Sequence, residues 1–342
     1  MKNILIIKIG AIGDIIMALP TLSSIKQNHP NCKVTWVCGA IVEPILKCMP
    51  DLDRIISIDE KKIFSKNKVS VLKALTHYYR TVGLERFDLV LNFHHDARYS
   101  ALHRLVRKDR LQVLTRNGDR PKLIPARSRS FEHLRLYKDF DHEYDEYLKF
   151  PRYNLPEFNI EAFIKINSEQ KLITLAPGGA NNMLNEQALR RWPIINYREI
   201  IKYFSSAGTI VCVTGAPSDG WVADELKDLT YINLIGKLSL VQLISLFKKS
   251  DIVLTHDSGP FHLAIFAEKP KVIGLFGPTN PREFNYKLEN NHVNVIWGGK
   301  DLQCAPCYFG KNFSLGCTNN ICMQQIAPKM VIDEIERLIE VI

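Results

Sequence analysis

The sequence predicts an α/β protein of two doubly wound, parallel-sheet domains, and three observations support this prediction. The chain has 342 residues, more than the roughly 250–300 residues that one hydrophobic core usually reaches. Short apolar runs alternate with longer stretches of helical spacing, as in parallel sheets whose strands are connected by helices. After about residue 160 the alternation starts again. We therefore expect a domain over 1–160, a second over 161–328 and a closing helix over 329–342.

The first half begins with the continuous apolar run 3–9, which is typical of a strand buried on both faces. The further strands expected in this half are 33–38, 55–58, 89–92 and 111–114, with helices over 15–27 and 68–83. The polar segment 128–159 predicts a helix followed by the crossing into the second domain, because Pro151 and Pro156 interrupt any longer regular element.

The second half repeats the pattern. Its expected strands are 172–176, 209–214, 232–234, 252–255 and 272–276. Its expected helices are 197–206, 222–228, 240–248, 261–266 and the amphipathic stretch 330–341. In such sheets, ligands bind outside the carboxyl ends of the strands, so the loops that follow the strands are the candidate sites.

Composition and charge limit the function classes. Hydrophobic residues make up 46% of the chain and the formal net charge is +9, which favours an ordered protein with an anionic partner. Eleven of the basic residues lie between Arg98 and Arg135, where a solvated surface is the alternative interpretation.

No zinc-finger, RNA-recognition or helix-turn-helix signature is present, which ranks nucleic acid last among the partners. Lys8 and Asp14 interrupt the N-terminal apolar run and no apolar run reaches ~18 residues, so we expect a cytoplasmic protein without a membrane span.

The first candidate motif is the segment 8–14, Lys-Ile-Gly-Ala-Ile-Gly-Asp, which leads from a strand into a helix. Its glycines allow close approach of a ligand, and the helix N-terminus offers free N–H donors. The segment lacks both the dinucleotide fingerprint and the phosphate-loop motif. Asp14 is therefore either a helix cap or a general base at the strand edge.

Three further motifs follow strands of the second half. Gly178 and Gly179 follow one strand and precede the pair Arg190 and Arg191, whose planar guanidinium groups suit a diphosphate. A turn followed by a solvated basic helix is the alternative. The other two motifs are Thr214-Gly215 with Asp219, and Asp257-Ser258-Gly259 with His262. Alone, Asp219 is also compatible with a plain helix start and His262 with a buried core histidine.

These motifs, in this order, resemble glycosyltransferase family 9, the heptosyltransferases of the lipopolysaccharide inner core. The resemblance extends from Met1 to about Val331. It is carried by Gly13-Asp14 with Pro20 and Leu22, Pro177-Gly178 with Arg191-Trp192-Pro193, Thr214-Gly215-Ala216, Asp257-Ser258-Gly259 with His262, and Phe276-Gly277-Pro278-Thr279.

The resemblance implies a GT-B architecture, in which two Rossmann-like domains face an interdomain cleft. The first domain would hold the acceptor and the second a nucleotide sugar, most simply ADP-heptose. Asp14 would be the catalytic base. The implied donor-binding residues are Gly178, Gly179, Arg190, Arg191, Thr214, Gly215, Asp219, Leu238, Asp257, Ser258, Gly259 and His262. The implied acceptor-binding residues are Gly13, His94, Asp96, Arg98 and Arg120, with His95 at the same edge.

The implied reaction is a direct displacement with inversion, without a cofactor, on an anionic glycolipid or glycan acceptor. The protein would work in the cytoplasm, with peripheral contact with the cytoplasmic face of the inner membrane. Two departures leave the donor open: Arg190 replaces the usual lysine, and the segment 181–189 is longer and more polar than usual. The alternatives are a non-hydrolysing nucleotide-sugar epimerase and a catalytically silent nucleotide-sugar-binding partner.

Four cysteines form a separate candidate site. Cys304, Cys307, Cys317 and Cys322 lie within 19 residues, and the first two have the C-x2-C spacing of a tetrahedral metal half-site. Because disulfides are disfavoured in the cytoplasm, we expect a structural zinc or iron ion here, with free thiols as the alternative.

Overall fold

The computed structural model of the chain describes residues 1–94, 96–114, 128–138, 147–165, 167, 170–180, 187–284, 286–289, 292–307 and 317–341. The chain divides into two compact units. The N-terminal unit comprises Met1–Pro156 and Arg282–Glu289, and the C-terminal unit comprises Glu157–Pro281 and Asn290–Ile342. Each unit is described here by itself.

The N-terminal unit contains a five-stranded parallel sheet with the order β3-β2-β1-β4-β5. Its strands are β1 (Asn3–Ile7), β2 (Lys33–Gly39), β3 (Arg54–Ile58), β4 (Arg86–Asn92) and β5 (Arg107–Val113). Its helices are α1 (Ile12–Asn28), α2 (Glu43–Leu46), α3 (Glu60–Ile63), α4 (Lys68–Val82) and α5 (Arg129–Lys138), with a 3₁₀ helix η1 (Ala97–Leu102).

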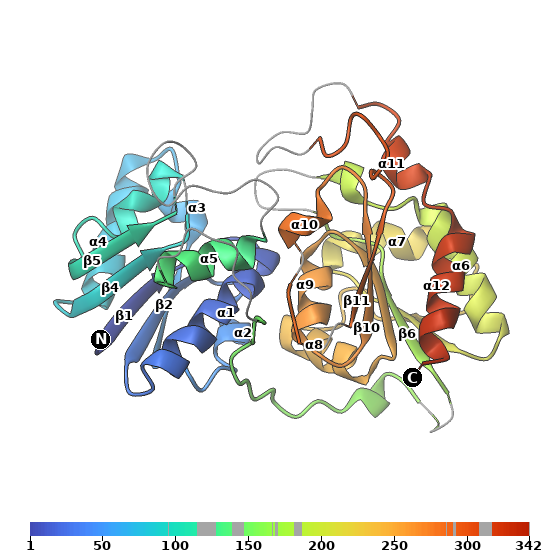
Figure 1. Cartoon of the computed structure of the whole chain (residues 1–342), viewed down its shortest axis with the longest axis horizontal. Coiled ribbons are helices and arrows are strands. Elements are labelled where there is room, and N and C mark those ends of the chain that lie inside the picture. The colour runs from blue at the N-terminus through green and yellow to red at the C-terminus, as the bar shows by residue number, and fades with distance from the viewer. Residues whose placement is uncertain are drawn as a thin grey trace. The chain divides into compact units, whose positions relative to one another are not determined.

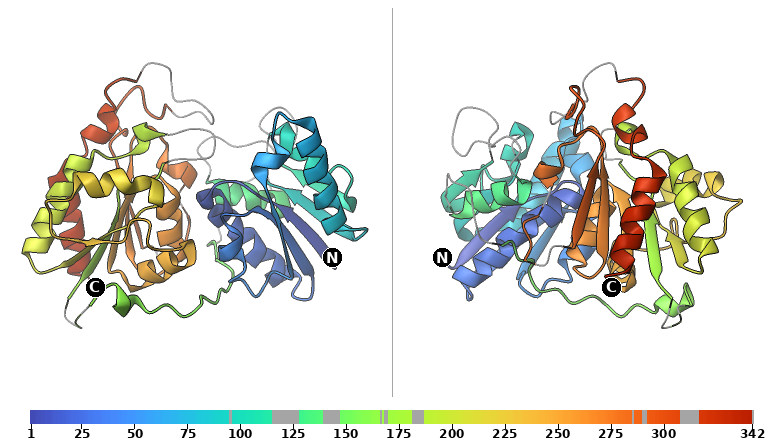
Figure 2. Two further views of the ribbon diagram at one scale, coloured as in Figure 1. Left: turned by 180° about the vertical axis from the view of Figure 1, so that it is seen from behind. Right: turned by 45° about the vertical axis from the view of Figure 1, so that its right-hand side comes forward.

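Helices cover both faces of this sheet (Figures 1 and 2). The helices α1 and α5 pack against each other on one face, and α4 lies on the other. Tyr78 and Val82 of α4 are buried against Leu5, Ile7 and Val90 of the sheet. Both faces of β1 are therefore covered, which agrees with its unbroken apolar sequence.

The C-terminal unit contains a six-stranded parallel sheet with the order β11-β10-β9-β6-β7-β8. Its strands are β6 (Leu172–Ala176), β7 (Ile210–Val213), β8 (Ile232–Asn233), β9 (Ile252–His256), β10 (Lys271–Phe276) and β11 (Val293–Trp297). Its helices are α6 (Ile194–Ser206), α7 (Gly220–Glu225), α8 (Leu240–Lys249), α9 (Gly259–Phe266), α11 (Ile321–Gln324) and α12 (Pro328–Ile339). The 3₁₀ helices are η2 (Ile160–Ala162), η3 (Ala188–Arg190) and η4 (Pro217–Asp219), and α10 (Pro281–Phe284) lies where the chain returns to the N-terminal unit.

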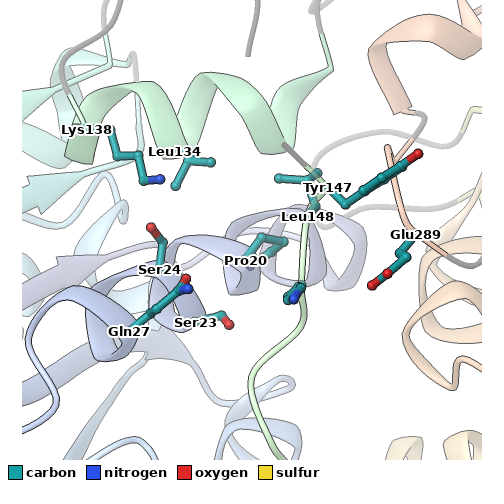
Figure 3. Close-up of a pocket in the computed structure, with 10 residues that line it drawn as sticks. Pro20, Ser23, Ser24, Gln27, Leu134, Lys138, Tyr147, Leu148 and Glu289 are labelled. Atoms are coloured by element: carbon teal, nitrogen blue, oxygen red, sulfur yellow. The ribbon is translucent and has the colours of Figure 1, made fainter. Parts of the chain in front are cut away.

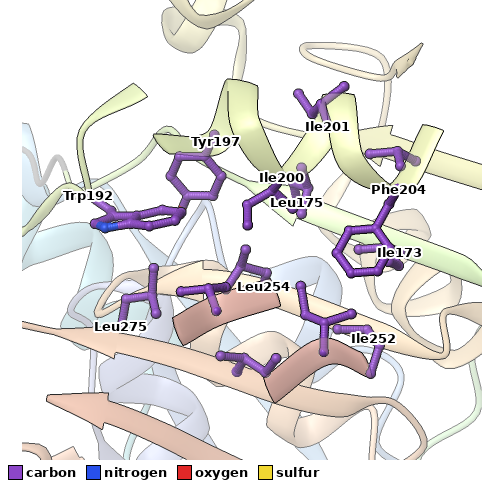
Figure 4. Packing of buried hydrophobic residues seen from close by; sticks show 14 of the residues in the cluster. Ile173, Leu175, Trp192, Tyr197, Ile200, Ile201, Phe204, Ile252, Leu254 and Leu275 are labelled. Carbon is purple, nitrogen blue, oxygen red and sulfur yellow. The ribbon is translucent and has the colours of Figure 1, made fainter. Parts of the chain in front are cut away.

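The core of the C-terminal unit forms where α6 packs on the sheet (Figure 4). Tyr197, Ile200 and Phe204 lie about one helical turn apart and are all buried, as expected for an amphipathic helix. They face residues of β6 and β9, including Leu175 and Leu254. Burial of an aliphatic or aromatic side chain contributes about 1.5–3 kcal/mol, so this face secures the position of the strand ends.

The observed architecture confirms the prediction of two parallel-sheet α/β domains. The division of the chain differs in detail from the one expected. The segment Arg282–Glu289 returns to the N-terminal unit, and α12, the expected closing helix, packs into the C-terminal core. Among the described residues, no helix combines the length and the hydrophobicity that crossing a bilayer requires.

Candidate active site

The strand order of the N-terminal unit defines a switch point between β1 and β4. Chain connections from β1 run to β2 and β3 on one side, while β4 and β5 lie on the other. Ligands of such sheets bind at the carboxyl ends of the two strands that flank this point. The segment 8–14 follows β1 and the segment 93–96 follows β4, so both predicted motifs of this unit meet at the expected place.

Asp14 is fixed in the first turn of α1 by its surroundings. Its Oδ2 atom lies 3.2 Å from Nζ of Lys8, and the same ammonium group donates to the carbonyl of Phe93 at 3.4 Å. A Cβ atom at Gly10 would lie 2.8 Å from this Oδ2 atom, so only glycine leaves room for the carboxylate. The Asp14 side chain is 36% exposed, which keeps it accessible to a substrate.

The charge state of Asp14 follows from these neighbours. Burial alone would raise the pKa of Asp14, but the positive charges of Lys8 and Arg129 together hold it well below its usual range. His133 is buried beside them, and burial lowers the pKa of this imidazole to about 3. Asp14 is therefore a carboxylate at neutral pH and can accept a proton from a ligand hydroxyl.

The acceptor-side residues predicted from sequence have different surroundings. His94 is buried: its Nε2 atom accepts the N–H of Ile9 at 2.9 Å, and its ring stacks on Tyr99 at 3.6 Å between centroids. Asp96 caps η1 and pairs with Arg98 at 2.8 Å. His94 thus positions the segment after β1, while Arg98 lies closer to solvent. Arg120 and His95 lie outside the described residues.

Four residues near Asp14 were not predicted from the sequence. Glu60, at the start of α3, has its Oε1 atom buried, and no described group hydrogen-bonds to this atom. Burial and the charge of Asp14 raise the pKa of Glu60, against the opposing effect of Lys8. Arg129 pairs with Glu283 at 3.2 Å. The other two are His133, described above, and Tyr286. Burial and the negative charge of Asp14 raise the pKa of Tyr286.

A separate pocket of about 290 Å³ lies between α1, α5 and the segment 147–149 (Figure 3). Ser23, Ser24 and Lys138 are among its lining residues. Ser23 lies nine residues beyond Asp14 on α1, about 14 Å along the axis. No residue of the Asp14 surroundings lines this pocket, so we do not assign the reaction to it.

The C-terminal unit has its own switch point, between β6 and β9. The loop after β6 carries Gly178 and Gly179, and a Cβ atom at Gly179 would lie 3.7 Å from Cβ of Ser258 in the loop after β9. Gly179 has a φ of 78°, which glycine adopts without strain. The two glycine-containing motifs predicted for the donor therefore lie against each other.

Asp219 shapes this edge. It is 2% exposed, and its two carboxylate oxygens accept the N–H groups of Gly179 at 2.9 Å and Ala216 at 2.8 Å. A Cβ atom at Gly178 would lie 2.3 Å from Cγ of Asp219, so the loop of Gly178 packs directly against this carboxylate. The structure supports a loop-shaping role for Asp219, and contact with a ribose remains a prediction.

Trp192 directly follows the two arginines of the second motif, and its indole is buried in the core (Figure 4). The indole N–H donates to the carbonyl of Ile326 at 2.9 Å. Arg190 reaches Oδ1 of the buried Asp257 at 2.9 Å, and Arg191 donates to the carbonyl of Gly179 at 3.0 Å. The arginines thus connect the two loops at the switch point and bring positive charge to it.

The remaining donor-side predictions divide into two groups. Ser258 is the N-cap residue of α9, so Gly259 lies at the positive end of the helix dipole. Thr214 and Gly215 directly follow β7, and a Cβ atom at Gly215 would lie 3.0 Å from Cβ of Asp219. His262 is buried within α9 against Phe261, and Leu238 is half-buried before α8.

The four cysteines come near one another without forming a metal site in the described structure. Cys307 and Cys322 are buried, Cys317 is half-buried and Cys304 is exposed. Burial and the other three thiols raise the pKa of Cys322 to about 11. Within the described ranges, which omit 308–316, no three Cys, His, Asp or Glu residues are placed to hold a metal ion. The described geometry thus does not fit the expected ion.

Comparison with known proteins points to one family. The family model described as glycosyltransferase family 9 (heptosyltransferase) matches residues 135–318, more than half of the chain. The chain is 27% identical to the lipopolysaccharide core heptosyltransferase OpsX of Haemophilus influenzae over 308 residues, which cover 86% of this chain and 84% of that protein.

Solved structures share the fold over the whole length. A family 9 glycosyl transferase from Veillonella parvula has a TM-score of 0.74 and 19% identity, with coverage of 98% of this chain and 97% of that one. The E. coli heptosyltransferase WaaC with ADP-2-deoxy-2-fluoro heptose has a TM-score of 0.70 and 15% identity, with coverage of 98% and 99%. The fold is therefore that of the GT-B heptosyltransferases. The chain belongs to glycosyltransferase family 9, the heptosyltransferase family, and is a glycosyltransferase.

Proposed function

We propose that this enzyme transfers a heptose from ADP-heptose to a lipopolysaccharide core acceptor, with Asp14 as the catalytic base. The observation that carries the proposal is the partly exposed Asp14 carboxylate, kept ionised by Lys8 at the switch point of the N-terminal sheet. The relatives named above are heptosyltransferases of lipopolysaccharide, which supports the sugar and the acceptor class.

The donor is assigned to the C-terminal unit. The loop of Gly178 and Gly179, the charge of Arg190 and the N-terminus of α9 lie at the edge where β6 and β9 end. Such donors suit the diphosphate of ADP. The WaaC structure with a fluorinated ADP-heptose supports ADP as the nucleotide.

The proposed reaction is a single displacement with inversion. The oxygen of an acceptor hydroxyl attacks the anomeric carbon, the bond from that carbon to the diphosphate breaks, and ADP leaves with the electron pair. The hydroxyl proton passes to Asp14, a transfer worth about 10²–10⁴ in rate. Arg190 and the amide groups at the helix terminus stabilise the charge that gathers on the leaving diphosphate. No step is assigned to a cofactor.

The acceptor is assigned to the N-terminal unit. Its phosphates or carboxylates would meet the basic residues Arg98 and Arg120, and Gly13, in the first turn of α1, is predicted to contact the acceptor as well. The buried Oε1 atom of Glu60 lies at the same sheet edge as Asp14 and is suited to accept a sugar hydroxyl. We place the reaction in the cytoplasm, at the inner face of the inner membrane, where a lipid-linked acceptor would be presented.

A structural zinc or iron ion at Cys304, Cys307, Cys317 and Cys322 stays a separate prediction from the cysteine spacing. The proposed chemistry does not depend on it, and the described geometry does not support it. Metal analysis of protein purified without added metal decides the matter: one equivalent of zinc or iron per chain supports the site, and a trace amount removes it.

The test is a panel of nucleotide sugars, incubated with the enzyme with and without core lipopolysaccharide acceptors and followed by mass spectrometry. We expect loss of ADP-heptose only when an acceptor is present, with one heptose gained by the acceptor. NMR of the product should show the inverted anomeric configuration. Isomerisation of a donor without any acceptor would instead indicate an epimerase, and tight donor binding without turnover would indicate a silent partner.

A further inference from the structure

The helix α4 exposes an apolar stripe to solvent on the outside of the N-terminal unit. Val69 is 61% exposed and Leu72 is 66% exposed, whereas Tyr78 and Val82 on the opposite side of the helix are buried in the core. Figure 1 shows α4 on the face of its sheet opposite α1 and α5. Leu84, just after the helix, is 77% exposed. These side chains are more exposed than core packing requires, and Val69 and Leu72, three residues apart, lie on the same side of the helix.

Cations surround this stripe. The segment 61–84 contains Lys61, Lys62, Lys66, Lys68, Lys73 and Arg80 and no acidic residue. Lys68, Lys73 and Arg80 are exposed, and none of these three forms an ion pair with a described residue. The nearest acidic residue after the helix, Glu85, pairs with Arg54 at 3.5 Å. The helix therefore presents positive charge and apolar side chains on one face.

The loop 101–105 extends the same surface. Tyr78 donates its hydroxyl hydrogen to the carbonyl of Leu102 at 2.7 Å, and the Tyr79 hydroxyl accepts the N–H of Leu105 at 3.3 Å. These contacts hold the loop along α4. Leu105 is 73% exposed and its neighbour Arg104 is also exposed, so the loop repeats the combination of an apolar and a basic side chain.

We propose that this surface, formed by α4, Leu84 and the loop 101–105, docks the enzyme on an anionic lipid bilayer. Charge complementarity selects this occupant: exposed leucines and valine enter the interface while lysines and arginines meet acidic headgroups. A second copy of the chain docked through the same face would place like charges together. A nucleic acid would use the cations but leave the apolar stripe in water. The inference extends the proposed function, because a lipid-linked acceptor lies at a bilayer surface.

The test is co-sedimentation of the full-length enzyme with vesicles of phosphatidylcholine, alone or mixed with anionic phosphatidylglycerol. We expect binding to the anionic vesicles that weakens with added salt. Charge reversal in Lys68→Glu with Lys73→Glu should weaken binding by roughly 25-fold or more, since each interfacial cation contributes about five-fold. Val69→Ser with Leu72→Ser should weaken it by about ten-fold.

The control variants make the same kinds of substitution, one residue each, in the C-terminal unit. Ile195→Ser alters an exposed apolar residue of α6, and Lys269→Glu reverses an exposed cation after α9. Both should bind vesicles as the wild type does. The proposal is overturned if the wild type ignores anionic vesicles, or if the α4 variants bind them as well as the controls.

Activity on a water-soluble, delipidated acceptor separates this inference from the transferase assignment. The α4 variants should keep wild-type activity there. If they lose it, the face serves the acceptor glycan and the docking proposal fails. Vesicle binding can be measured even if no nucleotide sugar is turned over, so failure of the proposed reaction leaves this test intact.

Discussion

Replacing Asp219 tests whether this buried carboxylate shapes the donor loop or binds the donor itself. Its oxygens accept the N–H groups of Gly179 and Ala216 at 2.9 and 2.8 Å, and the side chain is almost fully buried. A hydrogen bond to an ionised group contributes about 1.5–3 kcal/mol, and a buried N–H left without a partner costs a similar amount. We therefore expect Asp219→Ala to lower the free energy of unfolding by about 3–5 kcal/mol.

Two further variants calibrate this value. Asp219→Asn keeps one acceptor oxygen but turns an NH₂ group toward the other N–H, so about half of the loss is expected. Asp224→Ala removes an exposed carboxylate from the neighbouring helix α7 and should change the free energy of unfolding by no more than about 0.5 kcal/mol. Urea unfolding followed by tryptophan fluorescence measures all three variants.

Ligand affinity then separates the two roles. If Asp219 shapes the loop, the Asn variant should bind both ADP and inorganic pyrophosphate more weakly, because the loop that carries Gly178 and Gly179 is displaced for both. If Asp219 binds the ribose directly, ADP affinity should fall while pyrophosphate affinity stays unchanged. Calorimetry that shows this second pattern, with wild-type stability, would refute the loop-shaping argument and restore the ribose assignment.

Three other predictions concern the Asp14 surroundings and the buried histidines. Lys8→Met removes the positive charge nearest to Asp14, so the pKa of Asp14 should rise and the acid limb of the kcat/KM pH profile should move to higher pH. If the variant folds and this limb does not move, Lys8 does not hold the pKa of Asp14 down. Glu60→Gln should raise KM for the acceptor by about ten-fold while KM for the donor stays constant, and a change in the donor KM alone would exclude an acceptor contact. Burial lowers the pKa values of His133 and His256 to about 3, below the unfolded value near 6.5, so their stabilising effect is lost as pH falls from 6.5 toward 3. Urea unfolding should show up to about 2 kcal/mol less stability per histidine at pH 5 than at pH 7, and a flat profile would show that these imidazoles titrate normally.

The alternation of apolar runs and helical stretches was sufficient to predict both sheets. It also placed Asp14 at the start of the helix after the first strand. In the structure this helix begins three residues before the predicted 15, with Ala11 as its N-cap residue, so Asp14 lies in its first turn and is not the helix cap. The strand Val293–Trp297 was missed because it is an edge strand without a fully buried residue and its neighbours contain polar turn residues. The strand Arg107–Val113 begins before the predicted 111, because its charged residues suit an edge strand with one neighbour.

The neighbours of Asp14 were harder to predict. Arg129 and Tyr286 come from segments far away in the chain, and only the return of Arg282–Glu289 to the N-terminal unit brings Tyr286 near. A signal for Glu60 was present, since it follows β3 at the carboxyl edge of the same sheet. For Asp219, the residue type suggested a ligand contact, whereas its burial and its two backbone partners could be known only from the folded structure.

The most direct test of the account is the turnover of ADP-heptose by Asp14→Asn in the presence of acceptor, with donor affinity measured in parallel. The substitution keeps the shape of the side chain and removes its capacity to accept a proton. We predict that kcat falls by about 10²–10⁴ while the Kd of ADP-heptose is unchanged, because the donor is assigned to the C-terminal unit. Turnover within a few-fold of wild type, or loss of donor binding, would contradict the assignment of Asp14 as the base.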